Sequence, residues 1–404
     1  MHSDQPAATK ITGLKAIPRG VWALGFVSLF MDISSEMVHS LLPVFLVSVL
    51  GASVLSVGLI EGIAEATALI TKIFSGVLSD ILRRRKPLAV IGYGLAALTK
   101  PLFALAPSVG WVMAARFTDR VGKGIRGAPR DALLADVTPP ELRGAGYGLR
   151  QSLDSVGAFA GPLLAIALMA LLADNIRAVF WFAVIPAFIA VAFLLWGVKE
   201  PARTQPDGKA QAPIKLNDLK RLGSAYWWIV LVGGALTLAR FSEAFLLLRA
   251  EDIGLSITLI PLVLVVMNVV YALSAYPAGY LSDRLQRHTL IGAGFIVLIV
   301  ADLILALATN IWQVMIGVVF WGLHMGLTHG VLAALVADTS PPELRGSAFG
   351  MFNLVSGICL LFASLIAGGL WDRYGAPVPF YAGAIFASIA LCGLVGIARY
   401  RYRD

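Results

Sequence analysis

The chain has 404 residues, of which 58% are hydrophobic and only 14% are charged, against about 25% charged in an average soluble domain. This composition excludes a disordered chain, and two cysteines exclude a disulfide scaffold. A mean hydropathy of +0.81 and 40 glycines are typical of helices packed in lipid, where small residues let backbones approach. The formal net charge of +8 lies in short breaks between apolar runs, so we expect no nucleic-acid partner.

Twelve apolar stretches are long enough to cross a hydrocarbon core of about 30 Å. In chain order they cover residues 20–48, 55–79, 87–106, 109–136, 145–172, 177–198, 225–249, 257–282, 289–308, 311–337, 346–371 and 378–398. The sequence therefore predicts an all-α membrane protein with 12 transmembrane helices that lies in the lipid bilayer.

The loops between these stretches alternate in charge. Basic residues gather after the second, sixth and eighth stretches, whereas the loops after the first, third and ninth hold no Lys or Arg. Basic loops stay on the cytoplasmic side of a membrane. We therefore expect an inner-membrane protein with both termini in the cytoplasm.

An internal repeat divides the chain into two halves. Gly-Val-Leu-Ser-Asp at 76–80 recurs as Gly-Tyr-Leu-Ser-Asp at 279–283, and Ala-Asp-Val-Thr-Pro-Pro-Glu-Leu-Arg-Gly at 135–144 recurs almost unchanged at 337–346. Because both copies follow even-numbered stretches, the repeat is parallel, with its axis along the membrane normal. The predicted domains are an N-terminal six-helix bundle (1–198), a polar cytoplasmic linker (199–224) and a C-terminal six-helix bundle (225–404).

This plan and its paired loops resemble the major facilitator superfamily over essentially the whole chain. Gly76, Asp80 and Arg84 resemble the family's motif between spans 2 and 3, although an arginine replaces one glycine of that motif. Arg120-Val-Gly-Lys-Gly at 120–124 resembles the span-4 arginine motif. Gly157, Gly161 and Pro162 resemble the span-5 motif of proton-linked exporters, where they would serve helix packing, although Leu164 and Ala165 stand where further glycines are usual.

The resemblance implies a monomeric transporter that works by alternating access and exports a small-molecule substrate in exchange for protons. No cofactor is expected, because the chain has no phosphate loop, and it has no nucleophile elbow or zinc-protease motif that would indicate an enzyme. Export of a transition-metal cation and transport of an organic anion or zwitterion are alternatives within transport. A channel and a non-transporting receptor are the alternatives outside it.

Titratable residues in the first span are candidates for proton coupling. Asp32, Glu36 and His39 are spaced i, i+4 and i+7, so they share one helical face. An ionisable group at the bilayer centre costs about 2.5–3.5 kcal/mol on insertion scales, so such a cluster is either functional or a salt-bridged structural unit. Ser-Ser-Glu at 34–36 is matched by Phe-Ser-Glu at 241–243, which adds Glu243 as a candidate.

Glu61, Glu65 and Lys72 share a face of the second span. A buried Glu–Lys network and a proton path both fit this pattern, and an opposite charge would hold the carboxylates ionised. We therefore place Glu61 and Glu65 below Asp32 and Glu36 as proton-coupling candidates. Lys100 and Asp302, at equivalent places in spans 3 and 9, are expected to be snorkelling or helix-packing residues.

The fourth span carries a basic stripe with steps of three and four residues: Arg116, Arg120, Lys123, Arg126 and Arg130. Such a face cannot point at lipid. Arg116 and Arg120 lie deeper and are candidates for binding a substrate anion or pairing with carboxylates, as is Arg240 in the seventh span. We expect Arg126 and Arg130 to clamp Asp80, Asp136 and Glu141.

His324 and His329 complete the substrate-binding candidates. They are five residues apart, about 140° around a helix, so they do not form a two-ligand metal face and no metal site is predicted. The residues predicted to gate the cytoplasmic side lie in the paired loop motifs and at the lower end of the basic stripe. They are Gly76, Asp80, Arg84, Arg126, Arg130, Glu141, Arg143, Gly279, Asp283, Glu343 and Arg345.

Overall fold

The structure is a computed structural model that describes residues 17–82, 84–200, 221–282, 284–341 and 344–401, with the side chains of 77, 80–81 and 395–401 left out of the description. Within these ranges the chain forms helices and no strand. The helices of the first half are α1 (Arg19–His39), α2 (Leu42–Val44), the π-helical turn η2 (Phe45–Val49), α3 (Val54–Leu82), α4 (Arg85–Ala104), α5 (Val109–Asp136), the 3-10 turn η3 (Pro140–Leu142), α6 (Arg143–Leu171) and α7 (Ile176–Gly197).

The second half repeats this series. Its helices are α9 (Ser224–Ala239), α10 (Ala244–Asp252), the 3-10 turn η4 (Ile257–Leu259), α11 (Leu262–Ser282), α12 (Arg287–Leu307), α13 (Ile311–Asp338), α14 (Arg345–Tyr374) and α15 (Val378–Arg401). Among the described residues, ten segments are long and apolar enough to span a membrane, and α15 contributes the shorter apolar stretch Val378–Leu394. The helix α5 is also long enough to span a membrane, although its basic stripe lowers its hydropathy. The predicted all-α membrane fold is confirmed.

The repeat extends to the ends of the helices. At the start of α5, the Ser108 side chain accepts a hydrogen bond from the Trp111 N–H at 3.4 Å, and at the start of α13 the Asn310 side chain accepts one from the Gln313 N–H at 3.1 Å. Each cap satisfies an N–H group that a helix start leaves without an intrahelical partner. The two halves therefore begin equivalent helices with equivalent chemistry.

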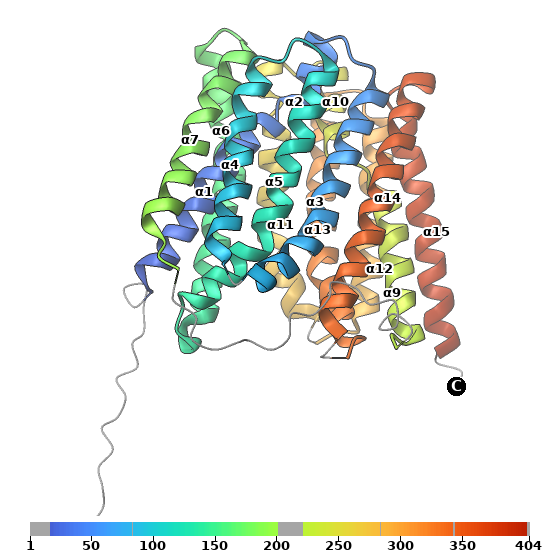
Figure 1. Cartoon of the computed structure of the whole chain (residues 1–404). Helices are drawn as coiled ribbons and strands as arrows, with labels where there is room; N and C mark the ends of the chain where they lie inside the picture. Colours follow the sequence, from blue (N-terminus) through green and yellow to red (C-terminus); the bar gives the residue numbers. More distant parts are fainter. Residues whose placement is uncertain (1–16, 83, 201–220, 283, 342–343, 402–404) are drawn as a thin grey trace, which may run out of the picture.

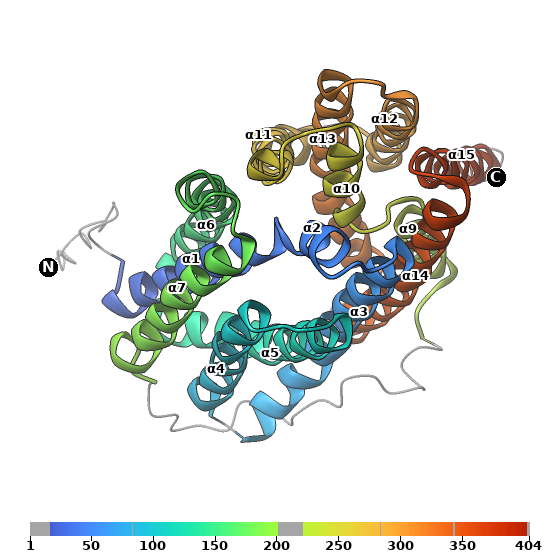
Figure 2. The same cartoon turned by 90° about the horizontal axis from the view of Figure 1, so that it is seen from above.

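The long helices run side by side between two ends of the molecule (Figure 1). We call the end where α1 begins and α15 finishes the terminal end, and the opposite end the far end. Figure 2 shows α1–α7 grouped on one side and α9–α15 on the other. The groups meet where α3 packs on α14, α6 on α11 and α2 on α10. The predicted domain boundaries stay a prediction, because residues 201–220 lie outside the described ranges.

The apolar core joins the two halves toward the far end. One buried cluster contains Phe45 of the first half and Phe245 of the second. Toward the terminal end the described residues form separate clusters, one around Val21 and Leu194 in the first half and one around Tyr226 in the second. The halves are therefore held together by hydrophobic packing mainly at the far end.

Glycines allow two pairs of helices to approach closely. A Cβ atom on Gly92 of α4 would lie 2.7 Å from the carbonyl oxygen of Gly122 on α5, and a Cβ atom on Gly58 of α3 would overlap the carbonyl oxygen of Ser364 on α14. Such approaches supply the van der Waals contact that replaces hydrophobic driving force between helices in lipid. The first pair lies within one half, and the second joins the halves.

We expect Gly92→Ala to destabilise the protein by about 1–3 kcal/mol, because the added methyl group overpacks the contact between α4 and α5. Thermal melting of the purified protein in detergent measures this. Gly94→Ala on the same helix is the matched control: nothing lies within 4 Å of a Cβ atom there, so the change should be neutral or stabilise by up to about 1 kcal/mol through helix propensity. Equal melting temperatures for both variants would contradict the packing argument.

Candidate functional site

A cavity of about 240 Å³ lies between the two halves. Helices α1, α3, α5 and α6 of the first half and α11, α14 and the segment between α9 and α10 of the second contribute to its wall. Its ionisable lining residues are Glu36, His39, Glu61, Glu65, Arg120, Lys123, Arg240 and Glu243. A polar cavity at the interface of two repeats is the place where substrate and coupling ions bind in repeat-built transporters.

The seventh span is broken at the cavity. The helix α9 ends at Ala239, residues 240–243 are irregular, and α10 begins at Ala244. Freed backbone groups find partners: the Ser242 N–H donates to Ser364 Oγ on α14 at 3.3 Å, and the Ala244 N–H donates to Ser242 Oγ at 3.3 Å. Irregular backbone inside a membrane is tolerated where it lines a cavity. The continuous helix predicted for 225–249 was wrong at this point, and no Gly or Pro marks the break in the sequence.

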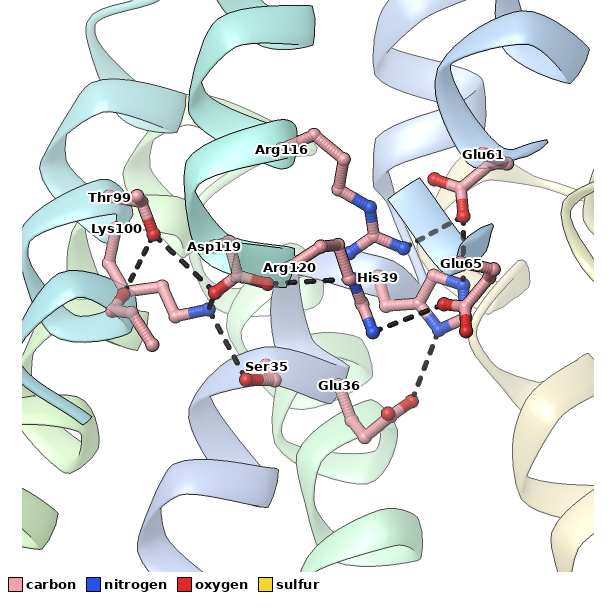
Figure 3. A network of polar contacts seen from close by, with 11 residues as sticks. Ser35, Glu36, His39, Glu61, Glu65, Thr99, Lys100, Arg116, Asp119 and Arg120 are labelled. Carbon is pink, nitrogen blue, oxygen red and sulfur yellow. Dashed lines mark hydrogen bonds and ion pairs between the residues drawn. The ribbon is translucent and has the colours of Figure 1, made fainter. Parts of the chain in front are cut away.

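One ion-pair chain runs from α5 through α3 to α1 (Figure 3). Arg116 Nη2 donates to Glu61 Oε2 at 2.8 Å, and both side chains are almost fully buried. The His39 ring lies between two carboxylates, with Nε2 3.7 Å from Glu61 Oε2 and Nδ1 3.5 Å from Glu36 Oε2. Glu61 is therefore anchored by an arginine, whereas the ion pair that Glu36 makes within the described part of the chain is with a histidine.

A second chain anchors Glu65 (Figure 3). Arg120 Nη1 lies 3.1 Å from Glu65 Oε1, and Arg120 Nε lies 3.6 Å from Asp119 Oδ2. Asp119 also accepts from Lys100 Nζ at 2.9 Å, and Lys100 donates to Ser35 Oγ on α1 at 3.2 Å. Lys100 is 1% exposed, so it packs between helices and does not snorkel. Of the two alternatives for Glu61 and Glu65, the Glu–Lys network does not form, because Lys72 is exposed and the glutamates pair with arginines of α5.

Glu36 and Glu243 are the cavity carboxylates that no arginine or lysine pairs with among the described residues. They come from opposite halves, as the match between 34–36 and 241–243 predicts. Asp32 lies one turn from Glu36 on α1, outside the cavity wall, and its carboxyl group lies within hydrogen-bonding reach of Asp154 on α6. The three acidic candidates of the first and seventh spans therefore have different surroundings.

The glycine motif of α6 packs against the acidic face of α1. A Cβ atom on Gly157 would lie 2.9 Å from Asp32 Cβ, and one on Gly161 would lie 2.8 Å from Glu36 Cβ. Pro162 follows inside α6. The spacing of the two glycines matches the spacing of the two acids, so any side chain at either position would displace the turn that carries Asp32 or Glu36.

Two cavity cations lack a carboxylate partner among the described residues. Lys123 is exposed on the wall formed by α5, and Arg240 is at the break of the seventh span. The Arg240 guanidinium contacts His329 Nε2 of α13. His324 is fully buried and its Nδ1 lies 2.9 Å from the carbonyl oxygen of Gly294. The geometry thus places His329 beside a cavity residue and gives His324 a helix-packing contact outside the cavity wall.

Arg126 and Arg130 do not form the expected clamp with Asp136. The Arg126 guanidinium lies 4.7 Å from the centroid of the Tyr93 ring, and Arg130 pairs with Asp131 at 3.0 Å. Arg126 points toward α4 and Arg130 toward α1, where it donates to Ser28 Oγ at 3.3 Å. Asp136 is the last residue of α5 and lies further toward the terminal end. The prediction of this particular pairing was therefore wrong.

The other described residues that were predicted to gate lie near the terminal end. Asp136 pairs with Arg85 of α4 at 2.6 Å, a partner on another helix that the spacing of residues within α5 does not indicate. Gly76 packs against Ala128 of α5, while Gly279 has open space around it. The exposed members of the set are Arg84, Glu141, Arg143 and Arg345. Asp283, Glu343 and the side chain of Asp80 lie outside the described residues, so the gating role of the set stays a prediction.

Asp302 of α12 is buried, at the place equivalent to Lys100. Among the described residues neither of its carboxylate oxygens has a hydrogen-bond partner, and a Cβ atom on Gly383 of α15 would lie 2.6 Å from its Oδ2. It therefore packs between helices. Of the two expectations for this residue, helix packing agrees with the structure and snorkelling does not. No group of three or more His, Cys, Asp or Glu side chains that could hold a metal ion occurs in the described part of the chain.

Comparison with known proteins places the chain in a family. The sequence profile of the Major Facilitator Superfamily matches residues 24–248 and 241–403. The chain is 31% identical to an uncharacterised MFS-type transporter of Methanocaldococcus jannaschii over 93% of this chain and 94% of the relative. It is 25% identical to the inner membrane transport protein YajR of Escherichia coli, over 92% and 82% of the two chains.

Solved structures share the fold. A crystal structure of a variant of the nucleoside transporter NupG superposes with a TM-score of 0.79 at 12% identity, and covers 93% of this chain and 99% of that one. An interface cavity between two six-helix repeats, a profile match over most of the chain and full-length relatives that are transporters agree with one another. The chain belongs to the Major Facilitator Superfamily and is a multi-pass membrane transporter for a small molecule, not an enzyme.

Proposed function

We propose that the protein exports a small molecule in exchange for protons across the inner membrane, by alternating access and with both termini in the cytoplasm. The observation that carries this proposal is the placement of Glu36 and Glu243. These two carboxylates line one cavity from opposite halves, and neither is paired with an arginine or lysine among the described residues. Movement of the halves would therefore change the surroundings of both at once.

Proton coupling needs a carboxylate that alternates between a hydrated and a desolvated environment. Glu61 and Glu65 are poorly suited, because Arg116 and Arg120 hold them as anions. Glu36 is better suited, because its described ionic partner is the His39 imidazole, with Nδ1 3.5 Å from Glu36 Oε2, and not an arginine or a lysine.

One feature supports export, and two support a location in the inner membrane with both termini in the cytoplasm. The exporter-like glycines Gly157 and Gly161 pack on the turns of α1 that carry Asp32 and Glu36. The described residues of the basic loops, such as Arg84 and Arg284, lie at the terminal end, which the positive-inside rule assigns to the cytoplasm. The relative YajR is described as an inner membrane transport protein. The monomeric state stays a prediction.

A second candidate function is transport of an organic anion or zwitterion. Lys123 and Arg240 line the cavity from opposite halves without forming an ion pair with a carboxylate of the described chain. A carboxylate or phosphate group of a substrate would supply the missing charge. Metal export receives less support, because the described residues provide no cluster of three metal ligands and the cations of the cavity would repel a metal ion.

The test of the proposal starts with a ligand. A thermal-shift screen of the purified protein across drugs, siderophores, metal ions and organic anions identifies one, since a ligand of the folded state raises the melting temperature. Vesicles containing the protein and an internal pH-sensitive dye then report proton movement when this ligand is added. Ligand-driven proton movement supports exchange with protons, and ligand transport without it would contradict proton coupling.

Glu36→Gln should abolish proton movement driven by the ligand while binding persists, because the amide imitates a permanently protonated carboxyl group. Glu61→Gln is the contrast. It leaves the buried Arg116 guanidinium without its partner, so we expect a lower melting temperature, with a cost of about 3–5 kcal/mol. Uphill transport at the normal rate in Glu36→Gln vesicles would exclude Glu36 as the proton carrier.

If the substrate has an anionic group, Arg240→Gln should weaken its binding by at least about tenfold, because a hydrogen bond to a charged group is lost. Calorimetry with the identified ligand measures the affinity. The control is Arg284→Gln, which changes an exposed arginine that stacks on Tyr280, far along the chain from the cavity lining. Equal affinities of the two variants would remove Arg240 from the binding site.

A further inference from the structure

The N–H groups of the first turn of α3 donate to acceptors in both halves of the protein. The N–H of Val57 donates to the Ser53 carbonyl at 3.2 Å, the first backbone hydrogen bond of the helix. The Ser56 N–H donates to Ser53 Oγ at 3.2 Å. The N–H groups of Val54 and Leu55 have no such local acceptor, since a helix start leaves them without an intrahelical partner.

Asp372 of α14 supplies the missing acceptors from the other half of the protein. Its Oδ1 accepts from the Val54 N–H and its Oδ2 from the Leu55 N–H, each at 2.9 Å. An aspartate is among the best helix caps, and its charge interacts favourably with the positive end of the helix dipole. The start of α3 is therefore capped by a residue 318 positions later in the chain.

Close packing of the two helices aligns this cap. One turn before Asp372 lies Gly368, and a Cβ atom there would lie 2.7 Å from the Leu55 Cα. The same face of α14 approaches α3 again at Gly58. After the cap, Gly375 ends α14 with φ +94°, a conformation that side chains rarely adopt. The carboxylate thus reaches α3 only while the two helices are in contact at the far end.

We propose that Asp372 is a positioning residue of the transport cycle, which caps α3 while the far end is closed and must release it when the far end opens. The proposal rests on the alternating-access part of the proposed function, and it needs no assumption about substrate, coupling ion or direction. Two other contacts join the halves, Ser48 with Glu251 and Thr258 with Asp174. Each is a single hydrogen bond between side chains, whereas Asp372 accepts two hydrogen bonds from the backbone of α3.

The far end can be followed by the distance between two spin labels, one in each half. Gly110 at the start of α5 is exposed with open space around it, and Trp312 at the start of α13 is 77% exposed. Both are changed to Cys for labelling after Cys359 and Cys392 are changed to Ser. Pulsed electron spin resonance on the protein in lipid nanodiscs then gives the ratio of far-end-open to far-end-closed molecules.

Asp372→Asn keeps one acceptor oxygen but loses the second acceptor and the charge that interacts with the helix dipole, so it should raise this open-to-closed ratio about fivefold. Val54→Pro is a second variant that leaves the carboxylate in place and removes one donor; proline is tolerated at the first position of a helix. It should raise the ratio in the same direction. A merely structural role of Asp372 would lower the melting temperature of the variants without changing the distance distribution.

Asp252→Asn is the matched control. Asp252 is also an exposed aspartate of the second half near the far end, but it pairs with Arg249 of its own half, so its loss should leave the ratio unchanged. A ratio that is unchanged in both Asp372→Asn and Val54→Pro, while the wild type shows two populations, would overturn the role of Asp372 alone. A single population in every protein would overturn alternating access as well.

Discussion

An unpaired charge inside a membrane is costly, and this constraint organises the first half of the protein. Lys100, Asp119, Arg120 and Glu65 form one chain of ion pairs across α3, α4 and α5, and Arg116 with Glu61 forms another. Removing one member would leave the other buried and unpaired, at a cost of several kcal/mol. The pairs therefore fix how these helices lie against each other. Glu36, which lies beside them on α1, has no ion pair with an arginine or lysine among the described residues.

The second half follows the same plan with different chemistry. At the places equivalent to Lys100 and Asp119 it has Asp302 and Trp321, both fully buried. At this depth the equivalent helices α12 and α13 are thus held by apolar packing, and the ion pair between them, Arg287 with Asp338, lies at the terminal end. Charged residues of both halves line the cavity, but those held in an ion pair with an arginine, Glu61 and Glu65, belong to the first half. The two repeats share a backbone plan while the ionic network is confined to one of them.

Sequence patterns predicted where most helices begin and end, but not which side chains of neighbouring helices contact one another. The span 109–136 and the helix α5 coincide, because lipid forces the backbone to satisfy its hydrogen bonds within each segment. Helical spacing placed Glu61, Glu65 and Lys72 on one face, yet it contains no information about which neighbour packs there, and the partners came from α5. The break at 240–243 was missed for a similar reason: its backbone is stabilised by Ser364, more than a hundred residues away.

Ser364 has one further consequence. Its hydroxyl accepts from the backbone of the break that lines the cavity, and its carbonyl faces Gly58 at the seam between the halves. One residue thus contacts both the wall of the cavity and the seam, so a ligand that prefers one arrangement of the break also prefers one arrangement of the seam. Thermodynamic linkage makes this influence mutual. The factor by which ligand shifts the opening of the far end must equal the factor by which opening changes the affinity for ligand.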